Sequence, residues 1–223
     1  MTQNIVEWPR FRDKCYVFKD RLQAGAFLAT ELEKHVKQNT ILLSLPAGGI
    51  PVGYAISKRL GIPLRVAVVR KIQVPWNTEA GFGAVAWDGS VVLNDVFLKE
   101  LGLTSKQIED CVSRTRQLIM ERVRKFTGGS FPEIGGRTVV LIDDGLASGY
   151  TMMAAAHSVR RLGPQRIAVA VPTGSNGAVQ LLSSKVDLLI CLNIRAGPVF
   201  AVADAYEEWY DLTDEEVVHY LQK

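Results

Sequence analysis

Two adjacent aspartates, Asp143 and Asp144, directly follow the apolar run 139–142, which has the length of a buried strand. After them comes a loop of mostly small residues, 145–151, and then the pattern of a helix over 152–162. Small side chains let several backbone N–H groups point into one concavity, and the following helix adds its positive N-terminal end. The segment therefore predicts a binding site for a phosphate monoester.

The two carboxylates cannot themselves bind a phosphate, because like charges repel each other. They suit a ligand that also carries hydroxyl groups or a divalent cation. A ribose 5-phosphate has both features, with its phosphate in the loop and its 2- and 3-hydroxyls toward Asp143 and Asp144. The hydroxyls of Ser148 and Thr151 could add donors to the phosphate.

This order of strand, acid pair and loop closely resembles the phosphoribosyl-pyrophosphate (PRPP) signature of type I phosphoribosyltransferases. The resemblance implies that Asp143 and Asp144 hold the ribose hydroxyls, directly or through Mg²⁺, so that metal binding is indirect. It implies that the 5-phosphate binds to Gly145, Leu146, Ala147, Ser148, Gly149, Tyr150 and Thr151. An ordinary strand–loop–helix turn with two solvated aspartates is the alternative.

A second loop, Pro-Ala-Gly-Gly-Ile-Pro over 46–51, follows the strand pattern of 40–45 and precedes a helix pattern that ends at Leu60. Adjacent glycines permit backbone conformations and close approaches that other residues do not. In type I phosphoribosyltransferases the corresponding loop binds pyrophosphate through its amides, a role that the resemblance gives to Ala47, Gly48 and Gly49. A plain tight turn would also account for the two glycines.

Two cations, Arg70 and Lys71, end a third apolar run over 64–69. Cations at the carboxyl end of a strand face the crevice in which open α/β sheets bind ligands, and arginine suits phosphate oxygens. The resemblance makes both residues catalytic, as groups that stabilise the departing pyrophosphate. The alternative is that one of them faces solvent.

The segment 72–94 is expected to be irregular, apart from a hairpin around Asp88-Gly89. The resemblance implies that this hairpin is flexible and closes over the active site to exclude water. Residues 193–212 and the N-terminal segment are expected to form a small hood beside the acceptor base. Phe200 or Tyr206 could stack on the base, or could simply pack in the interior.

Thr104 and Gln107 form a capping box that opens a long helix ending near Phe126, and Thr213 with Glu216 forms another. The long helix is basic, with arginines or lysine at Arg114, Arg116, Arg122, Arg124 and Lys125. A nucleic-acid surface is conceivable, but the basic residues are not interleaved with aromatic ones. A solvated or subunit-facing side is the favoured interpretation.

Apolar strand patterns at 40–45, 64–69, 139–142, 166–171 and 186–192 alternate with helix patterns. This alternation predicts an α/β fold with an open, mainly parallel five-stranded sheet and helices on both faces. We expect one domain over 1–223, with a core over about 18–192.

The composition sets further bounds. The chain has 223 residues, of which 48% are hydrophobic, and a net charge of +3, too small to indicate a nucleic-acid partner by itself. The cysteines Cys15, Cys111 and Cys191 form no CxxC or zinc pattern, which favours reduced thiols. No secretory signal or membrane-length apolar run is seen, so a cytoplasmic location is expected.

The resemblance extends over about residues 18–220 and is closest to a group of predicted phosphoribosyltransferases of bacteria and archaea. It implies a Mg²⁺-dependent transfer of the phosphoribosyl group from PRPP to a nitrogenous base in nucleotide metabolism, by a homodimer. Hypoxanthine-guanine transferases carry an acid where this chain has Ala147, which argues against a 6-oxopurine acceptor that needs that acid. The alternative is a protein that senses PRPP or nucleotides, and that could bind RNA, without catalysis.

Overall fold

The computed structural model describes residues 4–36 and 38–222. Its centre is a parallel sheet of six strands with helices on both faces, which confirms the predicted α/β class. The strand order is β1 (Ile5–Val6), β9 (Leu188–Arg195), β8 (Arg166–Ser175), β7 (Thr138–Ile142), β2 (Thr40–Ser44) and β3 (Leu64–Val66). The predicted count of five strands was wrong, because β1 has only two residues and shows no periodicity.

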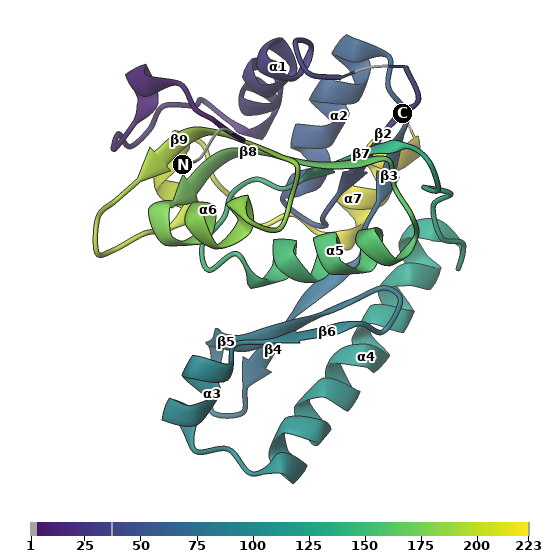
Figure 1. Ribbon diagram of the computed structural model, residues 1–223, viewed down its shortest axis with the longest axis vertical. Coiled ribbons are helices and arrows are strands. Elements are labelled where there is room, and N and C mark those ends of the chain that lie inside the picture. Colours follow the sequence, from purple (N-terminus) through teal and green to yellow (C-terminus); the bar gives the residue numbers. More distant parts are fainter. Residues whose placement is uncertain (1–3, 37, 223) are drawn as a thin grey trace.

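Helices cover the sheet in two layers (Figure 1). On one face lie α1 (Arg21–Leu32) and α2 (Gly49–Leu60), and on the other lie α5 (Tyr150–Arg161) and α6 (Asn176–Ser183). Successive strand residues point to opposite faces. In β7, Val140 and Ile142 accordingly join the apolar cluster under α1 and α2, whereas Val139 and Leu141 join the cluster on the α5 side.

A second, antiparallel sheet of three strands packs against α5. It consists of β4 (Val69–Val74), β5 (Asn77–Ala86) and β6 (Val91–Leu93). The predicted single strand over 64–69 is therefore wrong, because the apolar run is divided between β3 and β4, which belong to different sheets. The expected irregularity of 72–94 is also wrong, although the hairpin at Asp88-Gly89 is confirmed, with Gly89 at a φ of +81°.

Burial bears on the predicted flexibility of this hairpin. Phe82, Val85 and Trp87 are buried in the same apolar cluster as α5. Residues packed in this way cannot move as a flexible loop. The predicted flexibility is therefore wrong for residues 82–87. The turn between β4 and β5 is less packed, since Trp76 is exposed there. Closure of this turn over the active site stays a prediction.

Among the described residues there are three further α-helices: α3 (Asp95–Leu101), α4 (Ser105–Thr127) and α7 (Asp214–Gln222). The predicted capping boxes before α4 and α7 are both present. With the second sheet, α3 and α4 form the lower lobe of the molecule (Figure 1). In the described residues, none of the helices combines the length and the apolar character needed to cross a membrane.

The predicted hood has a definite structure. Its two segments are joined by backbone hydrogen bonds, among them Tyr16 N to Asp204 O at 2.8 Å and Phe18 N to Ala205 O at 3.0 Å. A short 3₁₀ helix, η1 (Pro9–Phe11), lies on the N-terminal side, and η2 (Val202–Ala205) lies on the other. Asp13 N also donates to Ile194 O at 3.0 Å, which ties the N-terminal segment to the end of β9.

Candidate functional site

The two predicted ligand loops leave neighbouring strands of the sheet. Strands β2 and β7 pair in parallel, with Ser44 opposite Ile142, so their following loops start at the same level. From β2 the chain proceeds to β3 on one side, and from β7 it proceeds to β8 and β9 on the other. This is the point of reversed strand order at which open α/β sheets bind ligands.

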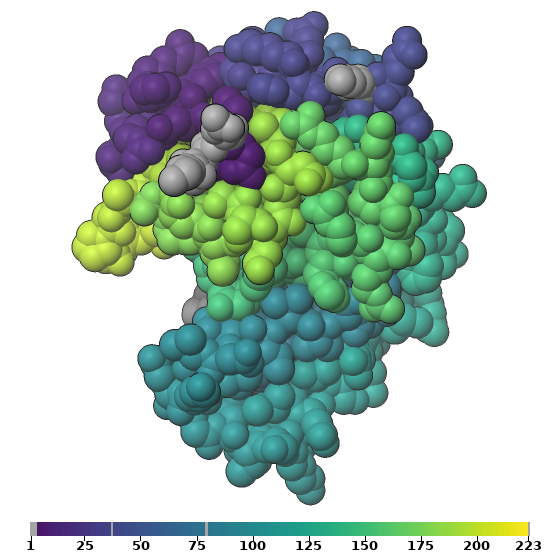
Figure 2. Space-filling view, viewed as in Figure 1, coloured from purple at the N-terminus to yellow at the C-terminus, as the bar shows by residue number. Residues whose placement is uncertain are grey.

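The surface is hollowed on the side of the molecule to which β8 and β9 point. Figure 2 shows this hollow at the left, between the segment around residue 200 above and the lower lobe below. In Figure 1 the loop after β9 extends toward that side. The candidate site lies at the carboxyl ends of β2 and β7, where the two loops begin.

The structure brings the pyrophosphate-loop candidates into contact with the acid pair. A Cβ atom added at Gly48 would collide with Oδ2 of Asp144, and one added at Gly49 would lie 2.8 Å from the carbonyl oxygen of Ile142 and 2.9 Å from Cα of Asp143. Both glycines are thus required by a close approach between the loops.

A buried ion pair lies within this contact. Nε of Arg21, the first residue of α1, is 2.9 Å from Oδ2 of Asp144, and both side chains are largely buried. The Tyr206 hydroxyl donates to the backbone carbonyl of Asp144 at 2.6 Å. The backbone N–H of Asp144 donates to Oδ1 of Asp143 at 2.9 Å. Asp144 is therefore held from several sides.

Sequence analysis did not identify Arg21 as a site residue. Its partner is 123 positions away in the chain, so no local spacing links the two. The available signal was the position of an arginine at the start of a helix that has one largely apolar face. That signal is weak, because such an arginine is usually solvated.

The two carboxyl groups differ in their electrostatic surroundings. Burial, and then the neighbouring Asp144 carboxylate, raise the pKa of Asp143 well above its ordinary value. Burial raises the pKa of Asp144 as well, but the Arg21 guanidinium opposes that rise. Asp144 is thus the member of the pair that has a cation to stabilise its charged form.

The loop after Asp144 is anchored by β8. Leu146 N donates to Thr173 O at 3.0 Å, Ser175 N donates to Leu146 O at 2.9 Å, and the Ser175 hydroxyl donates to Ala147 O at 2.7 Å. Ala147 and Ser148 are exposed, and Gly149 precedes the first turn of α5. Within the described residues, the N–H groups of Ala147, Ser148 and Gly149 have no hydrogen-bond partner.

Three predicted site residues have contacts that conflict with their predicted roles. The N–H of Leu146 is taken by Thr173 O, and the N–H of Gly49 donates to Leu45 O at 3.0 Å, so neither amide remains for a phosphate. Tyr206 is buried in the interior, with its ring 5.7 Å from that of Phe18, so it cannot stack on a base. It packs, as the alternative interpretation allowed.

Arg70 and Lys71 lie in β4 of the second sheet rather than at the carboxyl end of a parallel strand. The predicted position was therefore wrong, because the chain leaves the main sheet after Val66. Arg70 lines a cavity with Arg122, Lys125 and Asp214. Burial and the nearby Arg122 lower the pKa of Arg70, against the opposing effect of Asp214. Its action on pyrophosphate stays a prediction.

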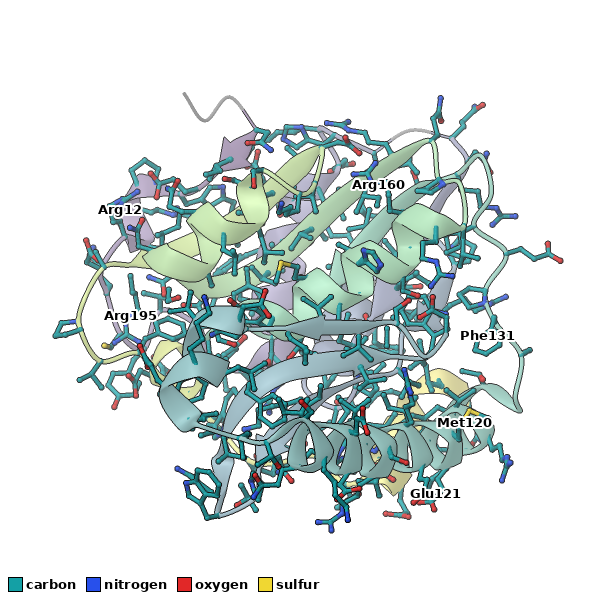
Figure 3. All side chains as sticks on the ribbon, turned by 60° about the horizontal axis from the view of Figure 1, so that its bottom comes forward. Arg12, Met120, Glu121, Phe131, Arg160 and Arg195 are labelled. Carbon is teal, nitrogen blue, oxygen red and sulfur yellow. The ribbon has the colours of Figure 1, made fainter. Side chains whose placement is uncertain are left out.

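Phe200 is half-buried in the loop after β9, with the Arg195 guanidinium 5.3 Å from its ring centre. Figure 3 shows Arg195 on the same side as that loop. The neighbouring Val199 is largely exposed. Of the two aromatic candidates, Phe200 is the less buried, and its contact with an acceptor base stays a prediction.

The basic side chains of α4 are partly used within the protein. Arg122 is 2.8 Å from Asp214, and Lys125 is 3.2 Å from Asp214 and 3.0 Å from Glu215. Met120 and Glu121 project outward from the same helix (Figure 3). Asp214 and Glu215 neutralise part of the positive charge that a nucleic acid would need. A solvated or subunit-facing side of α4 therefore stays the favoured interpretation.

The donor set suits a magnesium ion that arrives with its ligand. The described residues contain no cluster of three or more histidine, cysteine, aspartate or glutamate side chains that could hold a metal by themselves. Asp143 and Asp144 supply only hard carboxylate oxygens. Mg²⁺ is usually bound by one or two carboxylates together with substrate phosphates and waters, so these two residues fit an indirect role.

Replacing Gly149 with alanine should lower the free energy of unfolding by about 1–2 kcal/mol, because its φ of +81° is left-handed. The new methyl group would also lie 3.3 Å from Cβ of Ala178. Chemical denaturation measures the change. The matched control is Gly177→Ala in α6, where the added atom has open space. Equal effects in the two variants would show that the left-handed turn is not required.

Comparisons with known proteins agree with this geometry. Residues 18–202 match the family model described as phosphoribosyl transferase domain. Two Mycobacterium tuberculosis proteins, from strains CDC 1551 and H37Rv, carry the provisional name phosphoribosyl transferase and are 37% identical over 211 residues, 93% of this chain. The match covers 47% of their length, so the chain spans about half the length of these curated relatives.

Two further similarities concern the fold and a shorter segment. The crystal structure of the protein TT1426 from Thermus thermophilus superposes with a TM-score of 0.75 at 35% identity, covering 92% of this chain and 97% of that one. A ribose-phosphate pyrophosphokinase of Pyrococcus furiosus is 33% identical over 73 residues, which is 32% of this chain and 26% of its own length.

Proposed function

We propose that this chain, which belongs to the phosphoribosyltransferase family, transfers the 5-phosphoribosyl group of PRPP to a nitrogenous base and releases pyrophosphate. The observation that carries the proposal is the contact between the Gly48-Gly49 loop and the Asp143-Asp144 pair at the switch point of the sheet. That contact would put a pyrophosphate site beside a site for ribose hydroxyls.

In this proposal each loop binds one part of PRPP. The 5-phosphate binds to the amides of Ala147, Ser148 and Gly149 and to the N-terminal turn of α5, with hydroxyls from Ser148 and Thr151. The exposure of Ala147 and Ser148 supports this assignment. Leu146 contributes by anchoring the loop rather than by its amide.

The leaving group lies against the other loop. The amides of Ala47 and Gly48, which have no backbone partner among the described residues, would bind pyrophosphate. The bond between ribose C1 and the pyrophosphate oxygen breaks, and the pyrophosphate leaves with the electron pair. A base nitrogen forms the new bond to C1, and its proton passes to water. The Asp144 carboxylate, whose charged form Arg21 favours, would stabilise the positive charge that develops on the ring.

Asp143 and Asp144 would also hold Mg²⁺ indirectly, through the ribose hydroxyls or water. The chemistry that this ion supplies when bound is neutralisation of the charge on the departing pyrophosphate. The location in the cytoplasm, the homodimer and the identity of the acceptor base belong to the proposal as expectations from the family resemblance.

A panel of purine and pyrimidine bases, incubated with PRPP and Mg²⁺, tests the proposal by measurement of pyrophosphate release. We expect one base, or a few related ones, to raise release well above the rate without a base. If PRPP binds and no base raises the rate, the protein is a sensor of PRPP and not a transferase. If the protein is a sensor, RNA binding by the basic helix α4 would be a further property to measure.

A further inference from the structure

The guanidinium group of Arg21 joins three parts of the candidate site. Its Nε atom is 2.9 Å from Oδ2 of Asp144, and its Nη1 donates to the backbone carbonyl of Tyr210 at 2.8 Å. Its Cζ atom lies over the ring of Trp209, 3.8 Å from the ring centre. The side chain is thus fixed by an ion pair, a hydrogen bond and an aromatic contact.

This ion pair is more deeply buried than the others among the described residues. The side chains of Arg21 and Asp144 are 7% and 13% exposed, whereas in the Arg122–Asp214 pair both are 26% exposed. A buried charge that loses its partner is strongly unfavourable. Loss of either Arg21 or Asp144 would therefore leave the other charge buried without a partner, which is more costly than the loss of one partner in an exposed pair.

The pair also fixes the direction of the Asp144 carboxylate. Oδ2 is in contact with Arg21 and lies against Gly48, so the group cannot rotate freely. The Asp143 carboxyl also hydrogen-bonds to the Asp144 carboxyl. Because a carboxylate oxygen has two lone pairs, Oδ1, which Arg21 does not bind, can still accept a hydrogen bond from a ligand hydroxyl. Since Tyr206 and Arg21 both bind Asp144, the hood segment 206–210 is tied to the same residue.

We propose that Arg21 is the positioning residue of the ribose site: it holds Oδ2 of Asp144 and thereby aims Oδ1 at a ribose hydroxyl. The inference rests on the proposed function, because it assumes that Asp144 binds the ribose of PRPP. In this proposal Arg21 acts through Asp144 and not by contact with the substrate. Groups that orient the protein ligands of a metal typically affect affinity or activity by 10–100-fold, and an effect of that order is expected here.

A double-mutant cycle tests this role. PRPP with Mg²⁺ is titrated by calorimetry into the wild type, Arg21→Met, Asp144→Asn and the double variant. We expect Arg21→Met to lower the affinity at least about tenfold in the wild-type background and not to lower it further beside Asp144→Asn. An equal loss in both backgrounds would show that Arg21 only supports the fold, and an unchanged affinity in Arg21→Met would overturn the proposal.

A second variant guards against a folding defect. Arg21→Lys keeps the charge but cannot bind Asp144 and Tyr210 with one planar group, so we expect partial recovery of PRPP affinity relative to Arg21→Met. No recovery in a folded Arg21→Lys protein counts against the proposal. Arg160→Met, which removes an exposed pair with Asp187, is the control and should bind PRPP like the wild type.

Failure of this inference can be distinguished from failure of the proposed function. If the wild type binds PRPP and no base releases pyrophosphate, the transferase activity is disproved while the cycle still tests Arg21. If pyrophosphate is released normally and the cycle shows additive losses, only the inference is overturned. If the wild type does not bind PRPP, both are overturned.

Discussion

Replacing Asp144 with asparagine is expected to lower base-dependent pyrophosphate release by about 10²–10³-fold, the range seen when one preorganised electrostatic group is removed from an active site. Asparagine keeps the shape of the side chain but not its charge. It can neither accept hydroxyl donors as strongly nor stabilise the positive charge that develops on the ribose ring. Steady-state assays with the best base of the panel measure the change in kcat/KM.

The substitution also removes the charge partner of a buried arginine, so stability has to be measured beside activity. Circular dichroism and thermal unfolding show whether the variant stays folded. The matched control is Asp187→Asn. Asp187 directly precedes β9 and so lies at the amino-terminal ends of the parallel strands, whereas the candidate site lies at their carboxyl ends. A folded Asp144→Asn protein with wild-type kcat/KM would remove Asp144 from the reaction.

Alanine at Gly48 is expected to reduce kcat/KM by about 10²-fold, the order of loss that a displacement of about 1 Å can cause. The new Cβ would collide with the Asp144 carboxylate, which Arg21 holds from another side. The carboxylate can move only if that ion pair is disturbed. Kinetics and PRPP titration should therefore both show the defect, because the two loops share this contact.

Gly135→Ala is the control for this experiment. The atom nearest to its added Cβ is Leu162 O at 3.7 Å, an ordinary contact distance, and its backbone is not left-handed. We expect kcat/KM to stay within about twofold of the wild type, as is usual for substitutions away from special features. A Gly48→Ala protein as active as this control would mean that the close approach of the two loops does not matter for catalysis.

The sequence was sufficient to predict the two loops because their signals are local. The apolar run before Asp143, the small residues after Asp144 and the adjacent Gly48-Gly49 lie within short windows. Both loops follow parallel strands, and the carboxyl ends of parallel strands lie at the same edge of a sheet. The two loops were therefore expected to meet there. The structure places them in contact there.

The errors concern long-range features. The run 64–69 is apolar apart from Arg65, so periodicity could not show that it is divided between two sheets. Arg70 and Lys71 were misplaced for this reason. Strand β1 is held by β9, a partner about 180 residues away, and two residues carry no pattern.

The sequence also could not predict which single side chains are buried. Tyr206 has the same residue type whether it stacks on a ligand or packs in the interior, and only the fold shows that it packs. The pairing of Arg21 with Asp144 depends on how α1 is placed over the sheet. The same limit applies to the Leu146 and Gly49 amides, whose acceptors lie in the protein.

The most direct test of the central claim is a crystal structure of the protein soaked with PRPP and Mg²⁺. We expect the 5-phosphate on the amides of Ala147 to Gly149 at the start of α5, and the ribose hydroxyls at Asp143 and Asp144. Binding of the same ligand elsewhere, for instance with its phosphates between Arg70 and Arg122 and the acid pair empty, would contradict the claim.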